Sequence, residues 1–170
     1  ALPLGIGHIR TKTHDYIRHG TITLFAALNY LDGKILSRTE ARHTHAEWLR
    51  FLKQINRETP KDLDLHLIID NYATHKHAVV KQWLDKHPRF HIHFTPTSSS
   101  WLNLVERFFA DLTEECVREG SFTAVRQLIQ AIEEYLAARN EEPKRYVWRA
   151  EGQQILAKIQ RAREALAAVR

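Results

Sequence analysis

The chain contains no methionine and a single cysteine, Cys116, among its 170 residues. One cysteine excludes an intrachain disulfide and is typical of a reducing, cytoplasmic setting. Because translation starts at methionine, its absence predicts a processed form or a fragment of a longer protein. No apolar stretch approaches the roughly 20 residues that a membrane-spanning helix needs, and no charged-then-apolar signal segment opens the chain. We therefore expect a cytoplasmic protein that does not enter a membrane.

The composition is that of one ordinary globular domain, residues 1–170. Hydrophobic residues make up 44% of the chain, and the formal net charge is +5. This charge is compatible with an anionic partner such as nucleic acid but does not require one. Residues 144–170 carry seven Lys or Arg against two acidic residues. We expect them to form a basic C-terminal helical extension, which either follows DNA or is simply a solvated helix face.

The pattern of apolar residues predicts an α/β fold. Two apolar runs within 21–41 are joined by Asp32-Gly33, a pair typical of a hairpin turn. Strands expected at 63–70 and 89–97 enclose a short helix over 74–88, an order that favours parallel strands joined by a right-handed crossover. The other expected helices cover 44–60, which starts with the capping-box pair Thr44 and Glu47, and then 98–117, 123–140 and 152–168.

Two carboxylates occupy positions where chemistry is expected. Asp70 ends an apolar strand, and ligands of open α/β sheets bind beyond the carboxyl ends of strands. Glu106 interrupts an apolar helix start, and the loop before that helix would return it to the same sheet edge. Converging carboxylates suit Mg²⁺ or Mn²⁺, which in pairs hold the attacking and leaving oxygens of phosphoryl transfer. A structural role stays open, because a strand-end Asp often caps a turn and a helical Glu often lies at a solvated rim.

Polar and basic residues flank both carboxylates. His75 and Lys76 lie near the expected start of the helix over 74–88, where the positive helix end would help them to face phosphate; surface solvation explains them equally well. Asn71 and Asn103 could orient the acidic side chains through hydrogen bonds. Arg107 either contacts backbone phosphate or pairs with a carboxylate.

Eleven histidines raise the alternative of a zinc site. His91 and His93 would share one face of a strand. Zinc needs a third or fourth ligand in good geometry, and no cysteine pair is present to help. Hydrogen-bonded surface histidines are therefore the simpler interpretation.

The segments "LIIDNYATHK" and "FTPTSSSWLNLVERFF" together resemble the DDE-superfamily transposases of mariner-like bacterial insertion sequences. The resemblance extends to "THDYIRHGTITLFAALN" and "EEPKRYVW", and so to most of the chain. It implies that Asp70 and Glu106, separated by 35 residues, are the second and third catalytic acids. It also implies an RNase H-like fold with a mixed sheet flanked by helices, and Mg²⁺- or Mn²⁺-dependent cutting and joining of DNA. The implied partners are transposon ends and target DNA, and a homodimer stays open.

The first catalytic acid of this family lies on a strand upstream of the segment that matches residues 2–18. The resemblance therefore implies an amino-terminally incomplete domain, since Asp15, Asp32 and Asp64 do not match the missing position. That strand lies centrally in the family's sheet, so its absence would leave unpaired strand edges. Two other hypotheses remain: an inactive transposase remnant that binds DNA or a partner subunit, and a different metal-dependent hydrolase that uses histidines.

Overall fold

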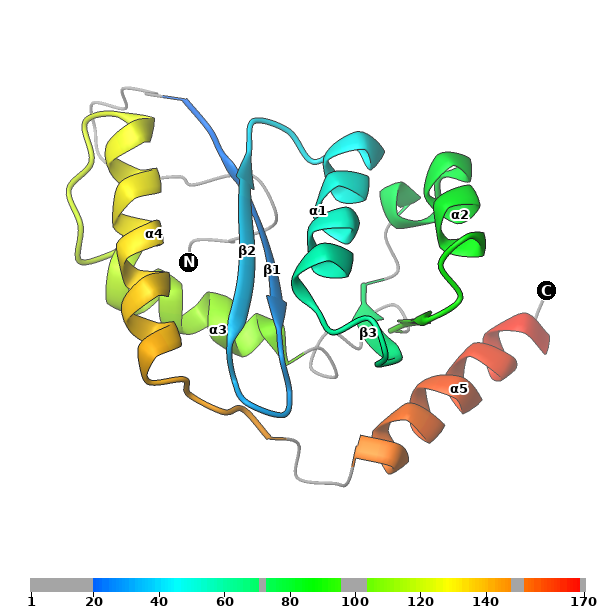
Figure 1. The fold of residues 1–170 in the computed structure, drawn as a ribbon. Coiled ribbons are helices and arrows are strands. Elements are labelled where there is room, and N and C mark those ends of the chain that lie inside the picture. Colours follow the sequence, from blue (N-terminus) through cyan, green and yellow to red (C-terminus); the bar gives the residue numbers. More distant parts are fainter. Residues whose placement is uncertain (1–19, 71–72, 96–103, 148–151, 169–170) are drawn as a thin grey trace.

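The structure is a computed structural model, and it describes residues 20–70, 73–95, 104–147 and 152–168. Figure 1 shows how its helices and strands are arranged. In chain order the elements are β1 (Thr23–Leu28), β2 (Ile35–Glu40), α1 (His45–Glu58), β3 (Leu65–Ile69), the 3₁₀ turn η1 (Ala73–Lys76), α2 (Ala78–Asp85), β4 (Phe90–Phe94), α3 (Val105–Leu112), the π-helical turn η3 (Thr113–Val117), α4 (Val125–Glu141) and α5 (Gly152–Ala168).

β1 and β2 form the predicted antiparallel hairpin. Within its connection, Asn29 exchanges backbone hydrogen bonds with Gly33 and Lys34, both at 2.8 Å. Gly33 has a φ of 79°, the left-handed conformation that glycine adopts most readily. A side-chain carbon there would also lie 2.7 Å from the carbonyl oxygen of Lys144. The glycine of the Asp32-Gly33 pair therefore serves both the turn and the close approach of a distant segment.

β3 and β4 pair in parallel, as the strand–helix–strand order predicts. Their register places His66 opposite His91, and Leu67 opposite Ile92. Among the described residues, this pair and the β1–β2 hairpin form two separate two-stranded sheets. The strand edges between the two sheets are thus not joined by hydrogen bonds within the described ranges.

Two hydrophobic cores lie on opposite faces of the hairpin (Figure 1). The α3–α4 core contains Ile35, Leu104, Phe108, Leu112, Val117, Leu128, Ile132, Leu136 and Tyr146. The α1–α2 core contains Phe25, Trp48, Phe51, Leu52, Ile55, Val80 and Phe90. Successive side chains of a strand point to opposite faces, so β1 contributes Leu24 and Ala26 to the first core, and Phe25 and Ala27 to the second. This double burial explains why the β1 sequence is apolar at every position but the first.

The starts of α1 and α2 follow local capping. Thr44 and Glu47 form the predicted capping box at the start of α1. The single helix expected over 74–88 is instead divided into η1 and α2, because His77 has an extended backbone and caps α2. Its Nδ1 atom accepts a hydrogen bond from the backbone N–H of Val79 at 3.2 Å. His75 and Lys76 therefore lie in the short turn before α2 and not in the helix itself.

The remaining helices agree with the expected ranges where the structure describes them. α4 and α5 occupy the predicted segments, while residues 144–147 before α5 are not helical. The first part of the helix expected over 98–117 falls outside the described residues. The part that is described ends in a π-helical turn. No helix in the described ranges is both long and apolar enough to cross a membrane.

Candidate active site

Asp70 is the first residue after β3, at the carboxyl end of the parallel pair. Thr95, the first residue after β4, fixes the position of this end. Its backbone N–H donates to the carbonyl of Ile69 at 2.8 Å, and its buried hydroxyl donates a long hydrogen bond of 3.4 Å to the Asp70 carboxylate. The sheet therefore presents Asp70 from a rigid strand end.

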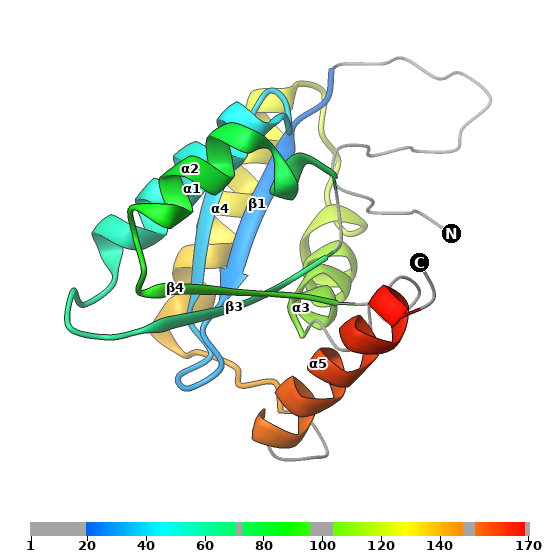
Figure 2. The same ribbon diagram turned by 90° about the vertical axis from the view of Figure 1, so that its right-hand side faces the viewer.

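Glu106 is the second residue of α3 and is half-buried. The helix is anchored by Phe108 and Leu112, which are completely or almost completely buried in the α3–α4 core. Figure 2 shows that β3 and β4 run toward this helix. Burial raises the pKa of Glu106, and the negative charge of Asp70 raises it further. The structure thus brings together the two acids that the sequence singles out.

Two neighbouring carboxylates fit a hard divalent cation. Each supplies oxygen donors of the kind that Mg²⁺ and Mn²⁺ prefer, and a cation would relieve the charge repulsion that raises the pKa of Glu106. Within the described ranges, no group of three or more His, Cys, Asp or Glu side chains could hold a metal ion. A role of Asp70 and Glu106 as metal ligands stays a prediction, and the described part of the chain adds no third acidic or histidine side chain to them.

His75 fastens η1 to the end of β3. Its Nδ1 atom lies 2.9 Å from the carbonyl oxygen of Asp70, so Nδ1 must carry the proton that is donated. The ring also contacts Trp48, with ring centroids 4.4 Å apart. Burial lowers the pKa of His75 despite the opposing effects of Asp70. His75 thus holds the backbone beside Asp70, and contact with phosphate stays a prediction.

The other residues singled out near the acids are placed as follows. Lys76 is exposed, and its Nζ atom lies 4.9 Å above the centre of the Phe94 ring. The Arg107 guanidinium donates a hydrogen bond of 3.2 Å to the carbonyl of Val147. The roles of both residues in DNA binding stay predictions. Asn71 and Asn103, expected to orient the acids, lie outside the described residues.

Three histidines gather on one face of the β3–β4 pair. His66 stacks on His91 and His93, with ring centroids 4.7 and 5.2 Å apart, and its Nδ1 lies 2.9 Å from Nε2 of His93. His91 and His93 thus share a strand face, as predicted. Because the rings stack and bond to each other, they do not form a metal-holding group in the described part of the structure. The zinc hypothesis gains no support from this arrangement.

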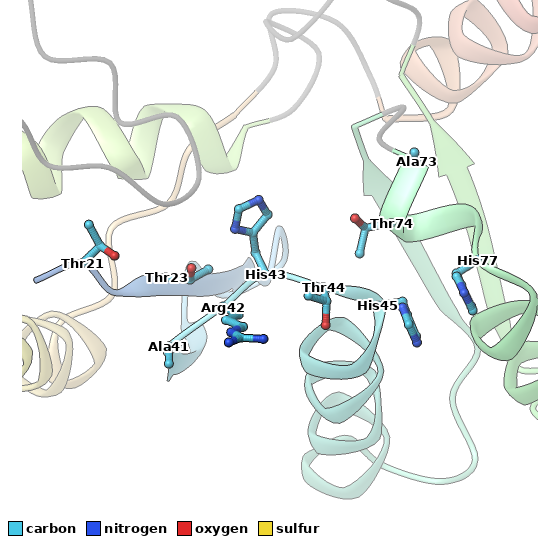
Figure 3. A pocket seen from close by; sticks show the side chains of 10 residues that line it. All are labelled: Thr21, Thr23, Ala41, Arg42, His43, Thr44, His45, Ala73, Thr74 and His77. Carbon is cyan, nitrogen blue, oxygen red and sulfur yellow. The ribbon is translucent and has the colours of Figure 1, made fainter.

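A pocket of about 580 Å³ lies beside η1, and no feature of the sequence pattern indicates it (Figure 3). Its walls come from the start of β1, the connection between β2 and α1, and η1 with the residue that follows it. Residues from three segments that are distant in the chain must fold together to form it. Of its walls, η1 lies closest in the chain to Asp70, beginning three residues after it.

Comparison with known proteins places these features in a family. The sequence model described as "DDE superfamily endonuclease" matches residues 6–129. The chain is also 26% identical over 113 residues to the insertion element IS630 uncharacterized 39 kDa protein of Shigella sonnei. That match covers 66% of this chain and 33% of the relative, so the chain spans about a third of the relative's length.

Two solved structures have a similar fold. One is a chain of the simian T-cell lymphotropic virus intasome in complex with the PP2A regulatory subunit B56 gamma, with a TM-score of 0.59 and 15% identity over 89% of this chain and 57% of that chain. The other is the catalytic core domain of BIV integrase, with a TM-score of 0.55 and 14% identity over 84% of this chain and 90% of that chain. The predicted RNase H-like fold class is confirmed by these similarities.

Proposed function

Because the chain belongs to the DDE superfamily of endonucleases, we propose that it acts as the catalytic domain of a transposase, cutting DNA strands and joining the freed ends to target DNA. The observation that supports the proposal is that Glu106 is near enough to Asp70 for the charge of Asp70 to raise the pKa of Glu106, in addition to the larger effect of burial. A carboxyl group with a perturbed pKa that lies near a second carboxylate at the end of a strand is typical of functional sites. The DNA partners follow from this reaction, and the homodimer stays a prediction.

In this proposal Asp70 and Glu106 hold Mg²⁺ or Mn²⁺. Such ions, when bound, activate the attacking oxygen and stabilise the departing one in an in-line displacement at phosphorus. In cleavage, a water oxygen bonds to phosphorus while the bond to the 3′-oxygen breaks, and that oxygen takes up a proton. In joining, a 3′-hydroxyl oxygen attacks in the same way and releases the 3′-oxygen of the target strand.

The chain's own residues position the acids for this reaction. Thr95 ties the ends of β3 and β4 together beside Asp70. His75 holds the backbone on the other side of the same residue. Glu106 reaches the site from α3, whose position is set by the buried side chain of Phe108. Both acids are therefore supported by packed elements, as precise placement of catalytic groups requires.

We further propose that a strand outside the described residues completes both the sheet and the site. Two observations support this proposal: the described strands form two separate pairs, and the described acids form a pair without a third member. A strand between β1 and β3 would join the pairs and could bring a further carboxylate to the same sheet edge. In this proposal residues 144–170 form the basic extension of the domain.

The test compares Asp70→Asn and Glu106→Gln in the protein extended upstream by its natural sequence. Each variant is expected to lose Mg²⁺-dependent nicking of a labelled duplex while keeping its affinity for that duplex. Glu133→Gln is the matched control, because Glu133 is exposed on α4. Cutting that survives in either acid variant would contradict the assignment. If the extended wild-type protein never nicks DNA, the inactive DNA-binding remnant becomes the better description.

A further inference from the structure

The pocket beside η1 has a basic and polar lining. We name it the Arg42 pocket, after the arginine that it shares with His43, His45, Thr74 and His77. Figure 3 shows Arg42 and His43 on the connection between β2 and α1 and His45 at the start of α1, with Thr74 and His77 across from them. None of its ten described lining residues is acidic. A concave site with this set of donors favours an anion.

Arg42 is the charged group of this site. It is exposed, while its neighbours Arg38 and Arg50 are both paired with Glu40, and Arg50 with Glu47 as well. The nearby carboxylates are therefore engaged by other arginines, and within the described residues Arg42 has no ion pair. A guanidinium that no carboxylate in this part of the chain engages, at the mouth of a cavity, is suited to bidentate contact with phosphate oxygens.

The histidines add ring N–H donors to the same pocket. His77 uses Nδ1 to accept the hydrogen bond that caps α2, so its Nε2 carries a proton in the neutral ring and can donate. His45 stacks face to face on His77, with ring centroids 3.7 Å apart and planes inclined by 4°.

We propose that the Arg42 pocket binds backbone phosphates of the DNA strand that lies at the Asp70–Glu106 pair. This inference rests on the proposed function and identifies a phosphate-binding surface for it. The wall formed by η1 begins three residues after Asp70 in the chain, which is the observation that relates the pocket to the acids. The lining donates hydrogen bonds and presents no base-specific arrangement, so the contact is independent of sequence.

The experiment measures binding of a fluorescent duplex and a fluorescent single strand by anisotropy, in EDTA, over a series of KCl concentrations. Each phosphate contact contributes about 0.9 to the slope of log affinity against log salt for duplex DNA and about 0.7 for a single strand. Arg42→Ala is expected to weaken binding several-fold at low salt and to reduce the slope by about 1. Arg42→Lys keeps the charge and should keep most of the slope.

Arg57→Ala is the matched control, because it removes the same charge from the far end of α1 at an exposed position. It should leave affinity and slope unchanged. An Arg42→Ala slope equal to that of Arg57→Ala would overturn the proposal. A second result would also overturn it. If inorganic phosphate or pyrophosphate raises the thermal midpoint of the wild type but not of Arg42→Ala, and both proteins bind DNA with the same affinity, the pocket binds small anions and not the DNA backbone.

The experiments distinguish failure of the phosphate-binding inference from failure of the proposed function. If Asp70→Asn abolishes cutting while Arg42→Ala binds DNA normally, only the phosphate-binding inference is wrong. If Asp70→Asn and Glu106→Gln both keep cutting, the catalytic assignment is wrong whatever Arg42→Ala does. Melting curves of the Arg42 variants in the absence of DNA should match the wild type, because this exposed loop residue contributes little to the cores.

Discussion

Replacing Glu106 by Gln is expected to stabilise the metal-free chain at neutral and alkaline pH. Burial and the charge of Asp70 raise the pKa of Glu106 in the folded state above the ordinary value of 4.5. The folded state then holds a proton that the unfolded state has released, so folding stability falls as pH rises from 4.5 through the folded pKa. Above that window wild-type Glu106 is ionised and destabilising, whereas the neutral amide of the Glu106→Gln variant carries no charge to be desolvated or repelled.

The stability difference between Glu106→Gln and the wild type is limited by the titration of one proton. The free energy of unfolding can change by no more than about 1.4 kcal/mol per pH unit, and each unit of pKa difference contributes that amount in total. For a chain of this length, 1 kcal/mol corresponds to roughly 2–4 °C in the thermal midpoint. Each unit of pKa difference therefore changes the midpoint by roughly 3–6 °C. Thermal unfolding of wild type and Glu106→Gln in acid and at neutral to alkaline pH, in EDTA, measures it.

The advantage of Glu106→Gln should be present at alkaline pH and small in acid below the ordinary pKa of 4.5, where wild-type Glu106 is protonated. Glu133→Gln, at an exposed position, should show no such difference. In an Asp70→Asn background the gain should shrink, because one of the two causes of the raised pKa has been removed. An advantage that is equal in acid and in alkali, or unchanged by Asp70→Asn, would refute the argument that the acids share one site.

Three further changes test the scaffold around the site. Arg89→Ala should lower the free energy of unfolding by about 2–4 kcal/mol in urea titrations, because Arg89 donates six hydrogen bonds, three of them to Asn56, and bonds from a charged donor contribute roughly 1.5–3 kcal/mol each with overlap. Phe108→Ala should cost about 3–5 kcal/mol in the same assay, since the ring is fully buried. Burial and nearby charges that include Arg163 lower the pKa of His93 in the folded state below 6.5. The stability that neutral His93 contributes is therefore present above pH 6.5 and is lost as pH falls through the folded pKa. His93→Gln should reduce this loss of stability, which denaturation at a series of pH values measures.

Much of the fold follows from local sequence signals. The Asp32-Gly33 pair predicts the hairpin because glycine accepts the positive φ found there. The spacing of Thr44 and Glu47 predicts the start of α1 because both ends of the capping box are local. The division of the helix expected over 74–88 was missed, because the cap is provided by His77, a residue that is not among the usual N-cap types.

The candidate site was predictable only in part. Asp70 and Glu106 stand out because each interrupts an apolar pattern, and in the structure the charge of Asp70 acts on Glu106. The Arg42 pocket has no comparable signal, because its walls come from three segments and its polar residues follow no period. The engagement of His75 with Trp48 was equally hidden, since a ring contact between distant elements leaves no mark on spacing.

The position of the acid pair between the two cores has a consequence for the whole fold. Asp70 follows β3, which packs on the α1–α2 core, whereas Glu106 lies on α3, which packs on the α3–α4 core. The distance between the acids therefore depends on how the two cores sit against β1, which contributes to both. A divalent cation held by both carboxylates would link the cores directly and offset the repulsion between the acids. Cation binding and the relative placement of the cores are then coupled, so Mg²⁺ should raise the thermal midpoint of the wild type and have little effect on Glu106→Gln.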